Sequence, residues 1–313
     1  MISGDSFTLA HLSDPHLAFP QDIRFADLLN KRFFGFMKWR LQRSYEHHAD
    51  VVANLIDDIK ANQPDHIVIT GDLTHLGLPA EIVKAKELLS ELGAPFRITV
   101  IPGNHDAYVA GALNRCLTHW IDYIVSDQTE ISEISPGESI STDALFPSLR
   151  VRGPVALIGV STARPCSTFL AVGSVGQDQL QRLRKLLMET ARQGLFRIVL
   201  LHHPPISGIV SWRKRLTDAK AFRTIVQQYG AELILHGHAH RRSHEQMKTP
   251  DGQAHVIGIS SASAVAGDSK RRARYHLYHL SRVAGQLEAR VTVRSYKSKE
   301  ERFVTEKKIR FLW

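Results

Sequence analysis

The feature that most constrains this chain is a pattern that occurs five times: an apolar segment with the character of a buried strand, followed at once by histidine, aspartate or asparagine. The clearest copy is His-Ile-Val-Ile-Thr-Gly-Asp at residues 66–72, which predicts a buried strand ending in a tight turn before Asp72. In chain order, the polar residues at the five strand ends are Asp14 and His16, then Asp72, then Asn104, His105 and Asp106, then His202 and His203, then His238 and His240. Because open α/β sheets bind ligands at the carboxyl ends of their strands, we expect these side chains to meet at one sheet edge.

Segments with helical spacing of apolar residues alternate with these strands. We expect helices over residues 45–61, 79–92, 107–126, 176–192 and 218–229, and further strands over 7–12, 96–101, 155–161, 196–201 and 232–235. Four more strands are expected after residue 253, over 255–260, 275–281, 287–296 and 303–313. The alternation predicts an α/β fold. Without a Pro-, Gly- or Ser-rich linker, the 313 residues are expected to form a single domain that includes the β-rich segment at 254–313.

Residues 22–43 carry an amphipathic helical stripe of apolar residues, three of them phenylalanines, and the segment has six basic residues against two acidic ones. This stripe lies in a predicted cap insertion at 20–44, directly after the first polar strand end. One interpretation is a cap packed on the body. The other is a basic, aromatic rim for an amphiphilic phosphate or an anionic membrane surface. Gly35 is expected to break the helix in two, and the Trp-Arg-Lys-Arg run at 212–215 follows His202 in a similar way.

The charge of the whole chain also favours an anionic partner. The formal net charge is +9 and the sequence pI is about 9.6, which suits a phosphate-bearing ligand. Nucleic acid is not favoured, because no glycine-aromatic binding module occurs. The basic residues Lys270, Arg271, Arg272 and Arg274 are expected to form a solvated charge run.

Two cysteines in no paired motif argue against a disulfide scaffold and fit a reducing compartment. The N-terminus lacks the basic and apolar regions of a signal peptide, and no apolar run is long enough to span a bilayer. We therefore expect a cytoplasmic protein, with peripheral contact to an anionic membrane through residues 22–43 as one alternative.

The residue types at the strand ends indicate the kind of metal. Imidazole, carboxylate and amide groups without thiolate suit Mn, Fe, Zn or Co rather than Ca. Seven candidate ligands are too many for one tetrahedral ion. They suit two divalent ions, about 3.5–4 Å apart, that share a carboxylate.

The order of these motifs resembles the calcineurin-like metallophosphoesterase superfamily: Asp-x-His, Gly-Asp, Gly-Asn-His-Asp, His-His-Pro-Pro and Gly-His-x-His. The forms Gly-Asn-His-Asp and Gly-His-Ala-His are similar to its class III cyclic-nucleotide phosphodiesterase and glycerophosphodiesterase branch. The resemblance covers residues 14–240 and implies a four-layer α/β/β/α sandwich with a dinuclear site. It implies a first ion held by Asp14, His16, Asp72 and His240, and a second held by Asp72, Asn104, His202 and His238, with His203 as the alternative to His202.

The same resemblance implies how the site works. Asp72 would bridge the two ions. His105 would lie near the leaving-group oxygen, where it could stabilise charge or donate a proton. Asp106 is expected to orient His105, and His75 to be a further supporting group. The expected reaction is in-line attack of metal-bound hydroxide on a phosphoester, in a phosphodiesterase for a cyclic nucleotide or another small diester. The alternatives are a lipid-precursor pyrophosphohydrolase or phosphatase for an amphiphilic substrate, a nuclease, and a non-catalytic scaffold of the same fold.

Overall fold

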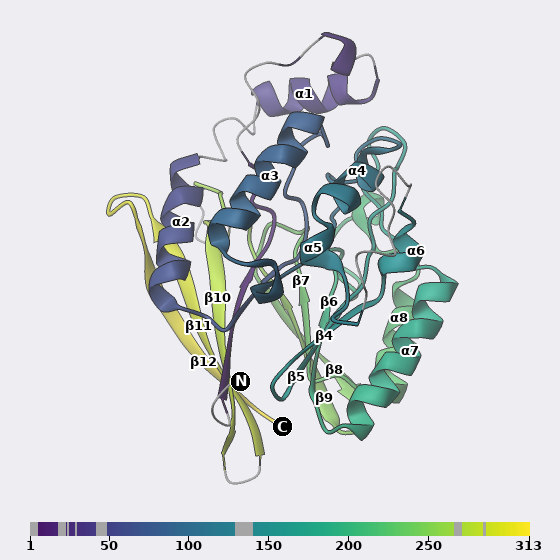
Figure 1. Ribbon diagram of the computed structural model, residues 1–313, viewed down its shortest axis with the longest axis vertical. Coiled ribbons are helices and arrows are strands. Elements are labelled where there is room, and N and C mark those ends of the chain that lie inside the picture. The colour runs from purple at the N-terminus through teal and green to yellow at the C-terminus, as the bar shows by residue number, and fades with distance from the viewer. Residues whose placement is uncertain are drawn as a thin grey trace.

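Two six-stranded sheets form the centre of the computed structural model, and helices cover their outer faces (Figure 1). The structure describes residues 6–17, 23, 25–28, 30–41, 49–128, 140–265, 271–283 and 286–313. The predicted α/β/β/α sandwich is therefore confirmed.

The first sheet has the order β12-β11-β10-β1-β2-β3. Its strands are β1 (Ser6–Leu12), β2 (His66–Ile69), β3 (Ile98–Val100), β10 (Arg274–Val283), β11 (Gln286–Lys297) and β12 (Arg302–Leu312). Strands β1, β2 and β3 are parallel, whereas β10, β11 and β12 continue the sheet in antiparallel pairs from β1.

The second sheet has the order β4-β5-β6-β7-β9-β8. Its strands are β4 (Ser148–Arg152), β5 (Val155–Gly159), β6 (Phe196–Leu200), β7 (Leu233–His236), β8 (Ser243–Thr249) and β9 (Gly252–Gly258). The four strands β5, β6, β7 and β9 are parallel, with β4 and β8 antiparallel at the two edges. The β-rich C-terminal segment thus contributes β9 to this sheet and three strands to the other.

Helices α2 (Ala49–Asn62) and α3 (Pro79–Leu92) lie against the first sheet, and α7 (Gln177–Arg192) and α8 (Ala219–Tyr229) against the second (Figure 1). The remaining helices are α1 (Arg32–Leu41), α4 (Ala112–His119), α5 (Ile121–Ile124) and α6 (Thr142–Leu145), with 3-10 turns η1 (Phe25–Leu28), η3 (Pro95–Arg97) and η5 (Trp212–Lys214). No helix in the described ranges is both long enough and apolar enough to cross a bilayer.

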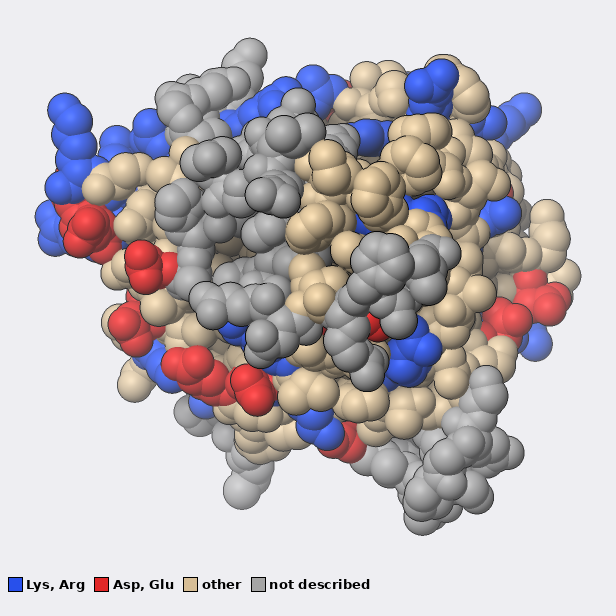
Figure 2. Space-filling view, turned by 90° about the horizontal axis from the view of Figure 1, so that it is seen from above, with Lys and Arg blue, Asp and Glu red and all other residues tan. Residues whose placement is uncertain are grey.

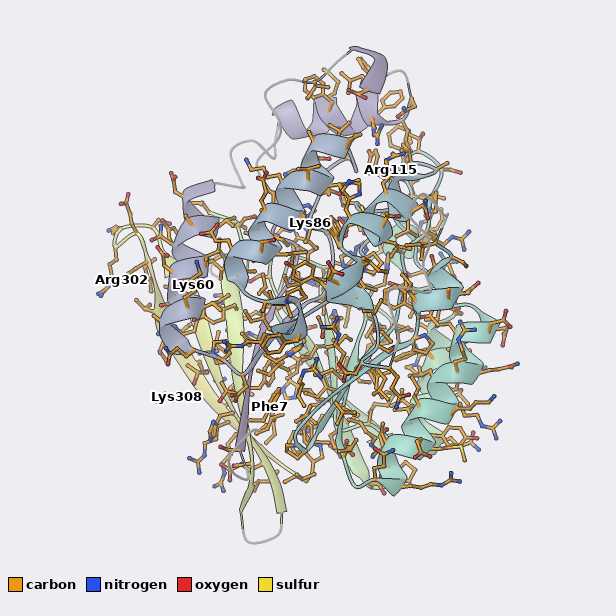
Figure 3. The ribbon with its side chains drawn as sticks, in the orientation of Figure 1. Phe7, Lys60, Lys86, Arg115, Arg302 and Lys308 are labelled. Atoms are coloured by element: carbon orange, nitrogen blue, oxygen red, sulfur yellow. The ribbon has the colours of Figure 1, made fainter. Side chains whose placement is uncertain are left out.

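The main hydrophobic core lies between the sheets and draws side chains from both of them. Figure 3 shows these side chains filling the interior, where Phe7 of β1 is fully buried, whereas Lys60 and Lys86 lie on the outer helices. A second core joins the outer face of the second sheet to α7 and α8. Burial on both faces explains why the parallel strands are continuous apolar runs.

The secondary structure differs from the expectation in three places. The helix expected over 107–126 begins at Ala112 and is divided at Trp120 into α4 and α5. Strand β8 was not expected. Gly35 does not break a helix but lies inside α1, where a Cβ atom would overlap with Tyr108 and Leu76, so the missing side chain lets α1 pack closely on the body. Of the predicted 22–43 stripe, residues 22, 24, 29, 42 and 43 lie outside the described residues.

Candidate metal centre

The predicted ligands come from two sheets rather than from one sheet edge. Asp14 and His16 follow β1, Asp72 follows β2 and Asn104 follows β3, while His202 follows β6 and His238 and His240 follow β7. The expectation of a single edge was wrong because periodicity identifies a buried strand but not the sheet that it joins. The parallel strands of the two sheets deliver these turns to the same end of the sandwich, beneath α1 (Figure 1).

Five of these residues have backbone conformations that L-amino acids rarely adopt. The φ angles are 53° at Asp14, 39° at His16, 56° at Asp72, 66° at His238 and 49° at His240. Only three other non-glycine residues in the described ranges have positive φ. Strain of this kind costs about 1–3 kcal/mol per residue and collects at functional sites. The concentration of strain marks this end of the sandwich as the functional one.

Two glycines let the strand-end turns approach each other. A Cβ atom on Gly103 would overlap with the Asp72 carboxylate, and one on Gly237 would overlap with the Ser13 hydroxyl and lie 2.5 Å from Asp14 Oδ2. Gly237 follows β7 in the second sheet, whereas Asp14 follows β1 in the first. The close contact between the two sheets at this point therefore requires glycine.

The first cluster contains Asp14, His16, Asp72 and His240, whose ligand atoms all lie within 4.8 Å of one another. His240 Nε2 lies 3.2 Å from Asp14 Oδ1 and 3.1 Å from His16 Nε2. His16 Nδ1 donates to the Thr74 carbonyl over 3.1 Å, which leaves the Nε2 lone pair directed into the cluster. A hydrogen bond of this type fixes the tautomer of a metal-binding histidine.

The second cluster contains Asp72, His202 and His238, again within 4.8 Å of one another. His202 Nδ1 donates to the Thr70 carbonyl over 2.7 Å, and its Nε2 lies 3.3 Å from Asp72 Oδ2 and 3.2 Å from Asn104 Oδ1. His238 Nε2 lies 2.9 Å from the Lys214 carbonyl, so donation there leaves Nδ1 as the ligand atom. Asp72 belongs to both clusters.

His203 points away from these clusters. Its Nδ1 lies 2.8 Å from the Thr162 hydroxyl and its Nε2 lies 3.1 Å from the Ala171 carbonyl. Both ring nitrogens are therefore occupied by the protein. Of the two histidines that the sequence left as alternatives, the structure places His202 in the cluster.

The two clusters fit cations. Asp14 Oδ1 is buried and makes no hydrogen bond of good geometry among the described residues, although His240 Nε2 lies 3.2 Å from it. Burial lowers the pKa of His202, but the charges of Asp72 and Asp14 outweigh burial and raise it to about 9. Burial raises the pKa of Asp14, and the nearby His240 more than reverses this effect and holds it well below its ordinary value. The carboxylates thus draw positive charge to the positions where their oxygens and the imidazole lone pairs converge.

Asp106 connects the turns after β2 and β3. Its carboxylate accepts hydrogen bonds from the backbone amides of Asp72 (2.9 Å), Thr74 (3.0 Å) and Gly103 (2.8 Å), and from the Thr74 hydroxyl (3.0 Å). Burial, with the charge of Asp72, raises the pKa of Asp106 to about 7. Asp106 therefore positions the turn that carries Asp72. The expectation that Asp106 orients the His105 ring was wrong, because its bonds go to these four groups.

His105 lines the cavity beside the clusters. Its ring Nδ1 lies 2.5 Å from the His75 carbonyl, which takes the orienting role expected of Asp106. His75 also lines the cavity, and its ring stacks on that of His16 with centroids 4.8 Å apart. His75 is thus a neighbour of the first cluster.

The sequence reasoning missed Glu81. Its buried carboxylate accepts hydrogen bonds from the amides of His75 (2.9 Å), Leu76 (3.0 Å) and Leu78 (2.9 Å), which fixes the turn that positions His105. Burial raises the pKa of Glu81. The available signal was a glutamate in the first turn of a helix that begins at Pro79, because glutamate at this position commonly accepts from preceding amides.

A cavity of about 570 Å³ opens above the clusters. Asp72 is its only acidic lining residue among those described, whereas five Lys and Arg side chains line it: Lys31, Arg164, Arg213, Lys214 and Arg271. The expected solvated run is wrong at Arg274, which is buried with Nε 2.7 Å from Glu306. Arg271 is exposed, as expected, and also lines this cavity, whereas Lys270 lies outside the described residues.

The sandwich, the strand-end turns and the shared carboxylate define a metallophosphoesterase-like protein. Residues 7–242 match the model of the calcineurin-like phosphoesterase family, and the chain belongs to that family of phosphoester hydrolases. The resemblance stated from the motifs is therefore confirmed.

Curated relatives place the chain near phosphodiesterases. It is 27% identical over 194 residues to a probable cyclic nucleotide phosphodiesterase of Synechococcus sp., covering 60% of this chain and 63% of the relative. It is 25% identical over 242 residues to a cAMP/cGMP dual specificity phosphodiesterase of Mycobacterium tuberculosis, covering 75% and 62%. A shorter match, 33% identical over 98 residues, covers 31% of this chain and 29% of a glycerophosphodiester phosphodiesterase of Enterobacter lignolyticus. The chain thus spans less than two thirds of the length of each of these relatives.

Solved structures show the same fold. A dimetal phosphatase from Danio rerio superposes with a TM-score of 0.63 at 13% identity, covering 92% of this chain and 96% of that one. At this identity the likeness concerns the fold alone.

Proposed function

We propose that this chain is a dinuclear-metal-dependent phosphodiesterase for a small diester such as a cyclic nucleotide. One observation carries the proposal: two clusters of ligand-type side chains share Asp72. Two cations that share a carboxylate are the arrangement used for in-line displacement at phosphorus. Convergence of all seven predicted ligands disfavours the alternative of a non-catalytic scaffold.

Each side chain has a proposed role. Asp14, His16, Asp72 and His240 would hold one divalent ion, and Asp72, Asn104, His202 and His238 the other, with Mn, Fe, Zn or Co as candidates. When bound, such ions supply Lewis acidity to the phosphoryl oxygens and activate water as the nucleophile. The carbonyls of Thr74 and Thr70 keep His16 and His202 in the tautomer that presents Nε2.

His105 is the proposed catalytic acid. Its Nδ1 donates to the His75 carbonyl, so a proton on Nε2 can be given to the leaving oxygen while the carbonyl stabilises the imidazolium. Asp106 acts as a positioning residue by holding the amides of Asp72 and Gly103. Activation of the leaving group matters most for diesters of poor leaving groups, such as cyclic nucleotides.

The cavity and the relatives support a diester. The curated relatives carry phosphodiesterase names, and the five cations of the cavity exceed what one transferring phosphoryl group needs. An amphiphilic phosphoester, including a lipid-precursor pyrophosphate, is a second candidate because Phe34 and Phe169 line the same cavity. Contact with an anionic membrane through residues 22–43 belongs to this second candidate, and Lys31 and Phe34 of that segment support it.

We also infer that residues 1–313 form one domain with a cap at 20–44, since β10 pairs with β1 and β11 and β12 extend the same sheet. A cytoplasmic location is proposed from the two free cysteines, Cys116 and Cys166, which suit a reducing compartment.

The proposal is tested with the Asp72→Ala variant. Bis-p-nitrophenyl phosphate, p-nitrophenyl phosphate, 3′,5′- and 2′,3′-cyclic nucleotides, glycerophosphodiesters and UDP-linked lipid precursors are assayed with added Mn, and bound metal is counted by mass spectrometry. The wild type should bind two equivalents, and the variant should lose metal and at least about 100-fold of its activity. Full turnover by a folded Asp72→Ala variant would refute the shared-carboxylate scheme.

A further inference from the structure

Large apolar side chains are exposed on the segments that line the metal cavity: Phe34 and Phe169 line it, and Phe33, Met37 and Trp212 lie within two residues of lining residues. Five of the nine large exposed hydrophobic residues in the described ranges are Phe33 (48% exposed), Phe34 (54%), Met37 (39%), Phe169 (76%) and Trp212 (63%). We call these five residues the apolar rim. Single exposed apolar side chains are ordinary, but a group of them around one opening indicates an interaction surface.

The apolar rim is continuous across three chain segments. Phe34 of α1 packs against Phe169 with ring centroids 5.8 Å apart, and Lys31 Nζ donates to the Cys166 carbonyl over 2.7 Å. The Ala171 amide donates to the Arg213 carbonyl over 2.9 Å, which joins the loop containing Phe169 to η5 and Trp212. The three segments therefore form one surface.

The rim is anchored to the body from below. Buried Arg32 donates through Nε to the Leu76 carbonyl over 2.9 Å and through a terminal nitrogen to the Gly77 carbonyl over 2.5 Å. These carbonyls belong to the turn that Glu81 holds. The exposed phenylalanines of α1 are thus presented on a fixed support.

The charge beside the apolar rim is positive. Five cations line the cavity, and three of them, Lys31, Arg213 and Lys214, lie within two residues of a rim residue in the sequence. The Arg213 guanidinium lies 5.3 Å from the Trp212 ring centre. Figure 2 views the molecule from the end that carries α1 and shows Lys and Arg side chains gathered along its upper edge and at a few places nearer the middle, with Asp and Glu mainly at the left, lower left and right. Apolar side chains beside Lys and Arg suit an anionic amphiphilic partner.

We propose that the apolar rim docks on an anionic phospholipid bilayer, with the mouth of the metal cavity facing the lipid headgroups. Phenylalanine, methionine and tryptophan side chains enter the interfacial layer, and the adjacent cations pair with lipid phosphates. The cavity then receives a phosphoester from the bilayer surface. Binding itself does not depend on catalysis, whereas delivery of substrate to the cavity rests on the proposed hydrolase function.

A bilayer fits the rim better than a nucleic acid. Protein surfaces for single-stranded nucleic acid align aromatic faces along a cationic groove. Here Phe33 and Phe34 pack edge to face, with rings at 80°, and Met37 extends the same helix with an aliphatic chain. Such a cluster offers apolar volume rather than a row of ring faces.

The proposal is tested by co-sedimentation of the full chain with vesicles. Wild-type protein should bind vesicles that contain about one-third phosphatidylglycerol in phosphatidylcholine, and should bind pure phosphatidylcholine far less. The double variant Phe33→Ser/Trp212→Ser, whose two side chains do not line the cavity, should lower binding to anionic vesicles at least about 10-fold. Phe96→Ser is the matched control, because Phe96 is 67% exposed on η3, before β3 begins, and should bind like the wild type.

Three outcomes would overturn the docking proposal. They are no binding of the wild type to anionic vesicles, binding by the double variant equal to that of the wild type, and preference of the wild type for a single-stranded oligonucleotide over these vesicles. Hydrolysis of soluble bis-p-nitrophenyl phosphate is measured separately without vesicles. Turnover without vesicle binding refutes the docking and leaves the proposed function standing. Vesicle binding without turnover on any substrate of the panel refutes the proposed function alone.

Discussion

The ligand clusters lie at the metal cavity and the apolar rim lies at and beside its lining residues, but the two are built in opposite ways. The ligand side chains are buried almost without exception, carry strained backbone angles, and are fixed by bonds to backbone carbonyls such as those of Thr70 and Thr74. The rim side chains are exposed and held by ring and backbone contacts between loops. We infer from this difference that the buried ligand clusters determine the type of reaction, whereas the exposed residues beside the cavity determine which substrate is bound.

The largest effect is expected from Gly237→Ala, which disturbs the geometry of the first cluster without removing a ligand side chain. The new methyl group would overlap with Ser13 and lie 2.5 Å from Asp14 Oδ2, so Asp14 must leave its place in the first cluster. We expect loss of one metal equivalent and at least about a 100-fold fall in kcat/KM. Metal counting and steady-state kinetics measure the two effects.

Gly194→Ala serves as the control for Gly237→Ala. No atom lies within 4 Å of a Cβ built on Gly194, although its φ of 67° makes alanine unfavourable by about 1–2 kcal/mol. This variant should be slightly less stable but should keep both metal equivalents. If Gly237→Ala also kept both, the close approach of the two sheets would not be what holds Asp14.

A smaller effect is expected from His105→Asn, which removes the proposed acid and leaves both clusters intact. Its backbone amide, which donates to Asp72 Oδ1 over 2.8 Å, is retained. We expect normal metal content and a fall in kcat of about 100-fold for cyclic AMP. The fall should be smaller for bis-p-nitrophenyl phosphate, since p-nitrophenolate leaves without a proton. An equal fall for both substrates would show that His105 does not protonate the leaving group.

The strand-end pattern indicated ten candidate residues, among them all the members of the two clusters. The choice of seven of them as ligands came from the resemblance of the motifs to a known family, and the pattern could not assign the strands to two sheets. Strand β8 could not be predicted, since only Met247 of its seven residues is buried. The segment is a strand because it pairs with β9. Sheet pairing joins residues that are distant in the chain, so no local pattern reports it.

The rim could be predicted only in part. The stripe at 22–43 and the run at 212–215 signalled part of it, but Phe169 comes from a segment without periodicity, as do the cavity-lining cations Arg164 and Arg271. Their place in the cavity wall depends on how loops pack after the sheets have formed. Asp106 shows the same limit within the site: its motif was recognised, but its bonds to three backbone amides became visible only in three dimensions.

The smallest effect is expected from Arg213→Gln, which removes one cation from the cavity wall. The backbone carbonyl that accepts from the Ala171 amide is kept, so the loops stay joined. Because this charge attracts an anionic diester without touching the reacting phosphoryl group, we expect KM to rise about 10-fold with kcat unchanged. The rise should shrink as salt is added, since exposed charges are screened. Arg192→Gln is the matched control, because Arg192 is 71% exposed at the end of α7 and does not line the cavity. A fall in kcat for Arg213→Gln at normal metal content would show that Arg213 takes part in the chemical step, and would contradict the division of roles between the buried clusters and the exposed residues beside them.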